Sequence, residues 1–163
     1  MTIFPLSRMD ARGFTFTEMM IVIVLAAVVT LGLVTFYLNS QILWTGASTQ
    51  ALAQRDATTL LELMRHDSQE ATSAVVDNGN QRVILYDAAL NETHRFFFSA
   101  ADSFVHSGDG VVVDRGPVTP TKVESFALSY DPNLGMLNVD TLRVRSTSGE
   151  RVALSTAIGL YNR

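Results

Sequence analysis

Residues 12–37 read RGFTFTEMMIVIVLAAVVTLGLVTFY, and this segment is the most informative part of the sequence about the fold. The 20 residues from Met19 to Leu38 carry no formal charge. A run of about 20 apolar residues is long enough to cross a bilayer as a helix. Glu18 stands directly at the head of this run, where a carboxylate is costly and commonly serves a function. Glu18 is therefore the first candidate functional residue.

The basic residues around the apolar run predict the orientation of the chain in a membrane. Arg8 and Arg12 precede the run, and the next basic residue is Arg55. The positive-inside rule then predicts a cytoplasmic N-terminus and a C-terminal domain on the other side of the membrane. A cleaved secretory signal would have a shorter apolar region, of about 7–15 residues. An uncleaved single-span anchor would account for the hydrophobicity but not for Glu18.

Composition excludes several classes of function. The formal net charge is −4, and the twelve basic residues form no tract of five or more, so no nucleic-acid partner is expected. The chain contains no cysteine, which excludes disulfides, thiolate metal sites and a cysteine nucleophile. Its 163 residues suit one small domain behind an N-terminal anchor.

The segment RGFTFTE, followed by the charge-free run, resembles the class III signal of type IV pilins and of the pseudopilins of type II secretion. The resemblance implies that a peptidase cuts after Gly13 on the cytoplasmic face. It also implies that the same enzyme N-methylates the new N-terminal residue, Phe14. The glutamate of the family pattern corresponds to Glu18, whereas Phe16 and Thr17 stand where leucine and isoleucine are usual.

The resemblance also implies a function and a set of partners. The expected protein is a minor pilin or pseudopilin precursor, anchored in the inner membrane and assembled into a filament with other pilin subunits. Its further partners would be the prepilin peptidase/methyltransferase and an inner-membrane assembly platform. The ending ALSTAIGLYNR is similar to the closing strand of J-type pseudopilins. Type II secretion, type IV pili and DNA uptake all remain open as the setting.

Glu18 has a specific expected role in assembly. Pairing of its carboxylate with the Phe14 amine of a neighbouring subunit would offset the cost of placing both charges in apolar surroundings. We expect such a pair to set the register between subunits.

The chain divides into four expected parts: a leader peptide at 1–13, a transmembrane and filament-core helix at 14–38, an amphipathic continuation at 39–76, and an antiparallel sheet domain at 77–163. The continuation shows the three-four spacing of a helix with one buried face. That spacing predicts helix through residue 74, with the face made by Ala53, Ala57, Leu60, Leu61, Met64, Ser68, Ala71 and Val75.

Short strand-like runs separated by turn residues follow the helix. The expected strands are 82–86, 93–98, 103–106, 111–115, 122–130, 140–146 and 152–161, and 116–120 is expected to be a loop because it contains two prolines. A long helix covering one face of an antiparallel sheet is an α+β architecture. It is also the pilin-like fold that the resemblance implies.

No pattern in the chain predicts catalysis, a cofactor or a metal site. There is no His-x-x-x-His, no Gly-x-Ser-x-Gly and no phosphate-binding glycine loop. We interpret His66 as part of a solvated helix surface, and His94 and His106 as structural. Ordinary turns explain two acidic groups that are weak calcium candidates: Asp102, Asp109 and Asp114, and Asp131, Asn133 and Asp140. The alternative function is a binding module or enzyme on an uncleaved anchor.

Overall fold

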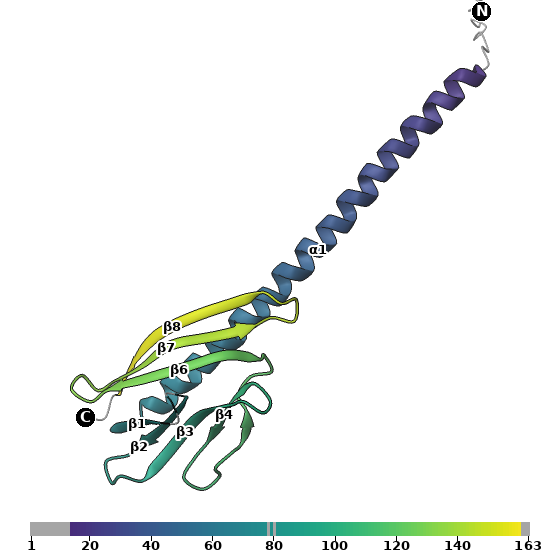
Figure 1. Cartoon of the computed structure of the whole chain (residues 1–163). Helices are drawn as coiled ribbons and strands as arrows, with labels where there is room; N and C mark the ends of the chain where they lie inside the picture. The colour runs from purple at the N-terminus through teal and green to yellow at the C-terminus, as the bar shows by residue number, and fades with distance from the viewer. Residues whose placement is uncertain (1–13, 78, 80, 161–163) are drawn as a thin grey trace, which may run out of the picture. The chain divides into compact units, whose positions relative to one another are not determined.

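A computed structural model describes residues 14–77, 79 and 81–160 of the chain. One long helix, α1 (Phe16–Ser68), precedes all of the strands (Figure 1). This order confirms the expected α+β fold of a long N-terminal helix and antiparallel β structure. The strands are β1 (Ser73–Asp77), β2 (Arg82–Tyr86), β3 (Glu92–Ser99), β4 (Phe104–Gly108), β5 (Gly116–Pro117), β6 (Val123–Asp131), β7 (Met136–Arg145) and β8 (Arg151–Gly159).

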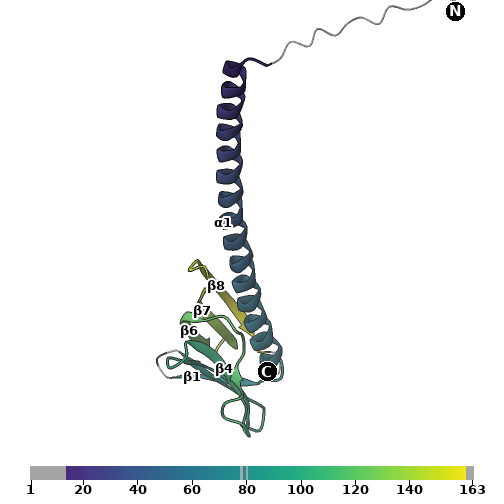
Figure 2. The ribbon, with the colours of Figure 1, turned by 90° about the vertical axis from the view of Figure 1, so that its right-hand side faces the viewer.

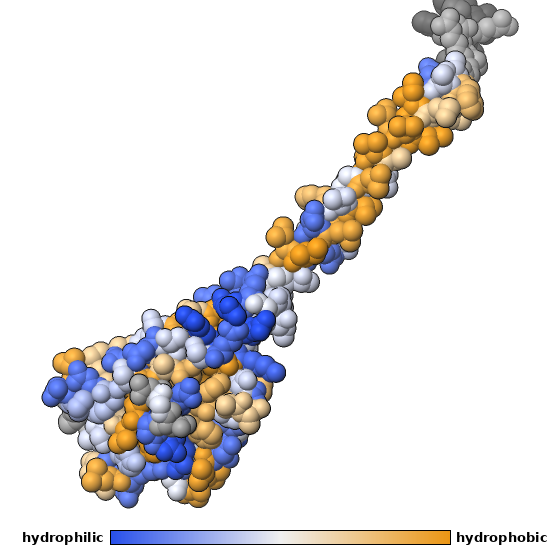
Figure 3. All heavy atoms as spheres, viewed as in Figure 1, coloured by the Kyte–Doolittle hydropathy of each residue, from blue (hydrophilic) through white to orange (hydrophobic). Residues whose placement is uncertain are grey.

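The chain forms two compact units, Met1–Leu43 and Trp44–Arg163. The described part of the first unit is helical from Phe16 onward, and every side chain in it is exposed. Apolar side chains line this segment on the face seen in Figure 3. The hydroxyls of Thr30 and Thr35 donate to carbonyls one turn back, Ala26 O at 2.7 Å and Leu31 O at 2.9 Å. These threonine hydroxyls therefore need no water, as a bilayer core requires.

The second unit contains the rest of α1, which packs one face against the strands (Figure 2). Ala53, Ala57, Leu60 and Met64 are each at most 2% exposed. They follow the three-four spacing that brings residues to one side of a helix. The amphipathic face predicted from the sequence is thus confirmed over this part of the helix.

The helix ends earlier than expected. We predicted helix through residue 74, and placed its continuation at 39–76, but α1 ends at Ser68 and β1 begins at Ser73. Ala74 pairs with Leu85 of β2, and Thr72 N donates to Tyr86 O at 2.8 Å. Strand pairing therefore satisfies these backbone groups, and it overrides a side-chain spacing that also suits a helix.

The strands form two sheets where the sequence analysis expected one. The first has the order β1-β2-β3-β4-β5 and the second the order β6-β7-β8, with every pairing antiparallel. Both sheets contribute buried side chains to one core with the helix. Its largest fully buried members are Leu60, Met64, Val83, Leu85, Phe96, Val105, Val123, Phe126, Leu128, Leu137, Val139 and Leu142.

Two local expectations about the strands are wrong. Residues 111–115 form a loop, because the backbone amides of Val111 and Val112 donate to the Asp109 carboxylate and so cannot join a strand ladder. Gly116 and Pro117, expected in a loop, pair briefly with β4 as β5. The proline is tolerated because β5 lies at the edge of its sheet.

Candidate functional site

The start of α1 is a closed hydrogen-bonded ring between Thr15 and Glu18. Oε2 of Glu18 accepts from Thr15 N at 2.9 Å and from Thr15 Oγ1 at 2.9 Å. Glu18 N in turn lies 3.3 Å from Thr15 Oγ1, its acceptor. This reciprocal arrangement is a capping box, in which the residue before the helix and the third helical residue satisfy each other's backbone donors.

The capping box positions the carboxylate that the sequence analysis singled out. Met19 N donates to Thr15 O at 3.1 Å, so the helical ladder begins directly behind the cap. Both bonds from Thr15 use the same Glu18 oxygen. Within the described residues, Oε1 accepts no hydrogen bond. The carboxylate is thereby oriented at the head of an apolar helix, with Oε2 engaged in the cap.

The cleavage site lies only partly within the described residues. Phe14 is 76% exposed and directly precedes the cap. Gly13 and the leader at 1–13 lie outside the described residues. Cleavage after Gly13 and N-methylation of Phe14 therefore stay predictions.

Thr15 was not among the functional residues predicted from the sequence. The pattern Thr15-Phe16-Thr17-Glu18 has the form Thr-x-x-Glu directly before an apolar run, which is a recognised signal for a helix start. We read Glu18 only as a partner for another subunit. The structure gives it a second role within its own chain.

We expect replacement of Thr15 by valine to fray the first turn of α1. Valine has nearly the same shape but lacks the hydroxyl that bonds Glu18, and losing such a cap costs about 0.5–2 kcal/mol. Hydrogen exchange of the amides of residues 17–19, measured on the full chain in detergent micelles, should accelerate by a factor of roughly 2–30. Thr15→Ser keeps the hydroxyl and is the control. Equal exchange in the valine variant and the wild type would contradict the capping role.

The structure places the three histidines in different surroundings. The His66 side chain is 73% exposed on α1, with Nδ1 3.2 Å from Asp67 Oδ1. His94 on β3 has its Nδ1 3.4 Å from Asp67 Oδ2. His106 on β4 is buried and lies between two carboxylates, Asp102 and Asp114. This last cluster was not predicted from the sequence.

Most of the acidic residues considered for calcium bond their own turns, whereas Asp140 lies on β7 and accepts from Ser129 Oγ at 3.2 Å. Asp102, Asp109 and Asp131 each accept from the backbone amide two residues ahead, at 3.2, 2.9 and 2.8 Å. This is the turn geometry expected for aspartate. In residues 14–77, 79 and 81–160, no group of three or more His, Asp or Glu side chains is placed to hold a metal ion.

Comparison with known families identifies the N-terminal segment. Residues 8–34 match the prokaryotic N-terminal methylation motif. This motif is characteristic of the class III signal of type IV pilins and pseudopilins, so the expected signal is confirmed. The comparisons with curated proteins and with solved structures each found no match.

The motif and the helix together define a class of protein. The chain carries the signal of a type IV pilin-like or pseudopilin precursor. Such a signal implies processing by a prepilin peptidase and assembly with other pilin subunits. In the part of the chain that the structure describes, α1 is the one helix long and apolar enough to span a bilayer. Its apolar segment and the signal fit an inner-membrane anchor.

Proposed function

We propose that this protein is a minor pilin or pseudopilin precursor, cut after Gly13 and N-methylated at Phe14. The mature chain would join a type II secretion pseudopilus or a type IV pilus-like filament through its N-terminal helix. The observation that carries the proposal is the methylation motif at residues 8–34, which spans the cleavage site, Glu18 and most of the apolar run.

The exposure of the apolar helix supports a role in assembly. Ile23, Leu33 and Phe36 are 65%, 64% and 73% exposed, and they are typical of the side chains of this segment. Exposed apolar area of this extent is unfavourable in water and needs lipid or other helices as its surroundings. A subunit held in the inner membrane would keep these side chains in lipid, and a filament would bury them between neighbouring helices.

Glu18 would select the position of each added subunit. Its carboxylate would pair with the methylated amine of Phe14 in a neighbour, with Thr15 holding the acceptor in place. An ion pair in apolar surroundings is favourable only when both partners meet with good geometry. Other registers would leave both charges unpaired, so the pair would act mainly as a register device.

The role would be structural, and we assign no catalytic residue, cofactor or metal. The orientation follows from Arg8 and Arg12, which would hold the N-terminus in the cytoplasm. The domain from Trp44 onward would lie on the periplasmic side. Similarity of the chain's ending to J-type pseudopilins favours a minor subunit and a secretion setting.

Mass spectrometry of the mature N-terminus tests the proposal. In cells with an active prepilin peptidase, we expect a chain that begins at Phe14 and carries one N-methyl group. Gly13→Val is the matched variant, because a β-branched residue at the cut should block cleavage and leave Met1 in place. An intact Met1 in the wild-type chain under these conditions would overturn the proposal and favour a module on an uncleaved anchor.

A further inference from the structure

The loop between β4 and β5 presents three consecutive valines to solvent. Val111, Val112 and Val113 are 91%, 42% and 61% exposed. We call residues 109–115 the valine loop. An apolar tip of this kind usually collapses onto the protein surface, because burial of apolar area is favourable. Its exposure therefore requires that the rest of the loop be held firmly.

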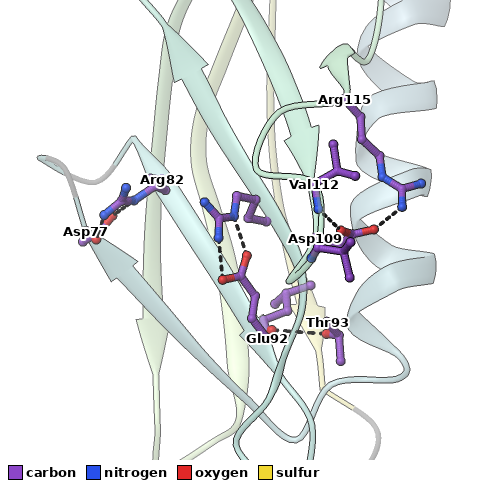
Figure 4. Close-up of polar contacts among 10 residues, drawn as sticks. Asp77, Arg82, Glu92, Thr93, Asp109, Val112 and Arg115 are labelled. Atoms are coloured by element: carbon purple, nitrogen blue, oxygen red, sulfur yellow. Dashed lines mark hydrogen bonds and ion pairs between the residues drawn. The ribbon is translucent and has the colours of Figure 1, made fainter.

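Hydrogen bonds inside the valine loop provide part of this hold (Figure 4). Asp109 Oδ1 accepts from the amides of Val111 and Val112 at 2.9 and 2.6 Å. The other carboxylate oxygen of Asp109 pairs with Arg115. Asp109 N donates to Val112 O at 2.8 Å, and Arg115 N donates to Ser107 O at 2.7 Å. The loop thus has one defined backbone path.

Two glycines allow the loop to pack this closely. A Cβ built on Gly108 would lie 2.2 Å from Val113 O, and a Cβ on Gly110 would lie 2.6 Å from Glu92 O. Real side chains do not approach backbone atoms so closely, so any other residue would push the loop away. The backbone at both positions is pressed against a neighbouring backbone segment.

His106 connects the valine loop to the turn before β4. Its side chain is 9% exposed, and its two ring nitrogens face carboxylates on opposite sides. Nε2 lies 2.7 Å from Asp102 Oδ2, and Nδ1 lies 2.8 Å from Asp114 Oδ1. Asp114 Oδ1 also accepts from Gly116 N at 2.7 Å. Asp114 therefore ties the end of the loop both to β5 and to the histidine.

The number of protons on the ring decides how many of these bonds form. A neutral imidazole has one N–H and can donate to one carboxylate only. Ionised carboxylates accept but do not donate. Both contacts are hydrogen bonds at once only when His106 is protonated on both nitrogens.

Uncharged residues neighbour His106 on both adjoining strands. From β3, Phe97 contributes an uncharged ring whose centroid lies 5.4 Å from that of His106. Pro117 of β5 is its strand neighbour. The other charged groups on adjoining elements have partners of their own: Glu92 with Arg95, Asp109 with Arg115, Glu124 with Arg145 and Arg151, and Asp131 with turn amides.

The electrostatics agree in direction with a protonated ring. Burial opposes the charge on His106, but hydrogen bonds to Asp114 and Asp102 outweigh burial and raise its pKa above the usual value near 6.5. The hydrogen bond from His106 lowers the pKa of Asp114. The stability that His106 contributes is thus complete below pH 6.5 and disappears as the pH rises through the raised pKa. The aspartates lose their contribution only in acid, below their usual pKa of 3.8.

We propose that doubly protonated His106 is a latch that fastens the valine loop to the turn holding Asp102. Loss of one proton leaves a single N–H, so either the bond to Asp102 or the bond to Asp114 is lost, and the ring no longer joins the loop to the turn. The loop is then held by the bonds of Asp109, the bond from Arg115 N to Ser107 O and the bond from Gly116 N to Asp114 Oδ1. Protonation of a single buried imidazole thereby controls how firmly the loop holds Val111–Val113 at the surface. The latch belongs to the domain from Trp44 onward and does not depend on filament assembly.

The test follows the ring and the loop on the full chain in detergent micelles. Nuclear magnetic resonance of ¹³C-labelled histidine gives the titration of His106, with His66→Gln and His94→Gln used to assign the three signals. Hydrogen exchange gives protection factors for the amides of residues 111–116 between pH 6 and pH 9. We expect His106 to titrate above 6.5, and loop protection to fall about tenfold as it does so.

Variants separate the latch from general stability. Asp114→Asn retains the size of the side chain but not its charge, and should lower the pKa of His106 and abolish the pH dependence of loop protection. His66→Gln changes an exposed histidine and should leave both unchanged. In His106→Gln, the amides of residues 111–116 should show low protection at every pH. If this variant does not fold, the wild-type titration and the Asp114→Asn variant still test the latch. A His106 that titrates at or below 6.5, or loop protection that is equal at pH 6 and pH 9 in the wild type, would overturn the latch.

Discussion

Glu18→Leu is expected to leave the protein in the inner membrane but to prevent its assembly into filaments. A neighbour's Phe14 amine would then enter apolar surroundings with no acceptor, and an uncompensated charge in such surroundings is strongly unfavourable. We expect filament incorporation to fall about a hundredfold or more. Quantification of the variant in sheared filaments against its amount in membranes gives the ratio directly.

A second variant separates the two roles of Glu18. Glutamine also completes a capping box, so Glu18→Gln should keep the hydrogen bonds to Thr15 and the helix start. It cannot supply the negative charge. If charge pairing selects the register, glutamine and leucine should both fail to assemble. Efficient assembly of Glu18→Gln would show that capping is the role of Glu18 in the filament, and assembly of Glu18→Leu would contradict both roles.

Leu60→Ala is expected to have the largest effect on folding of the domain from Trp44 onward. Leu60 is 1% exposed on the face of α1 that packs against the strands. Deleting a buried leucine side chain costs about 2–5 kcal/mol, because apolar contacts are lost and a cavity remains. Domains of this size are stable by only about 5–15 kcal/mol. Hydrogen exchange of the β6 and β7 amides, measured on the full chain in micelles, should become faster because the free energy of unfolding falls.

The matched control for this deletion is Leu134→Ala. Leu134 lies in the turn between β6 and β7 and is 65% exposed, so the same atoms are removed where they contact little protein. We expect a change within about 0.5 kcal/mol. Equal effects of the two variants would contradict the packing of this helix face against the sheets.

Local sequence patterns predicted much of this molecule. The charge-free run and the three-four spacing of Ala53, Ala57, Leu60 and Met64 both depend on residues close together in the chain. The capping box at Thr15 was equally readable and was overlooked. These features could be read from the sequence because helix periodicity, caps and turns need only neighbours a few residues away.

Pairing between distant segments decided the remaining features. Val75–Val76 and Val111–Val113 are both β-branched runs, yet only the first is a strand. Val75 and Val76 find partners in β2, whereas Asp109 takes the amides of Val111 and Val112. Both environments suit the same side chains, so composition could not separate them. The division of the strands into two sheets likewise depends on which distant segments pair, and this pairing cannot be read from composition.

The N-terminal signal and the cluster around His106 illustrate the difference. The N-terminal signal is read by an enzyme as a linear segment, so the order of residues from Arg12 to Glu18 is sufficient to recognise it. The cluster of Asp102, His106 and Asp114 exists only because β4 and β5 pair and return the chain beside the histidine. Hydrogen bonds act over about 3 Å in space, and sequence spacing alone does not specify such proximity.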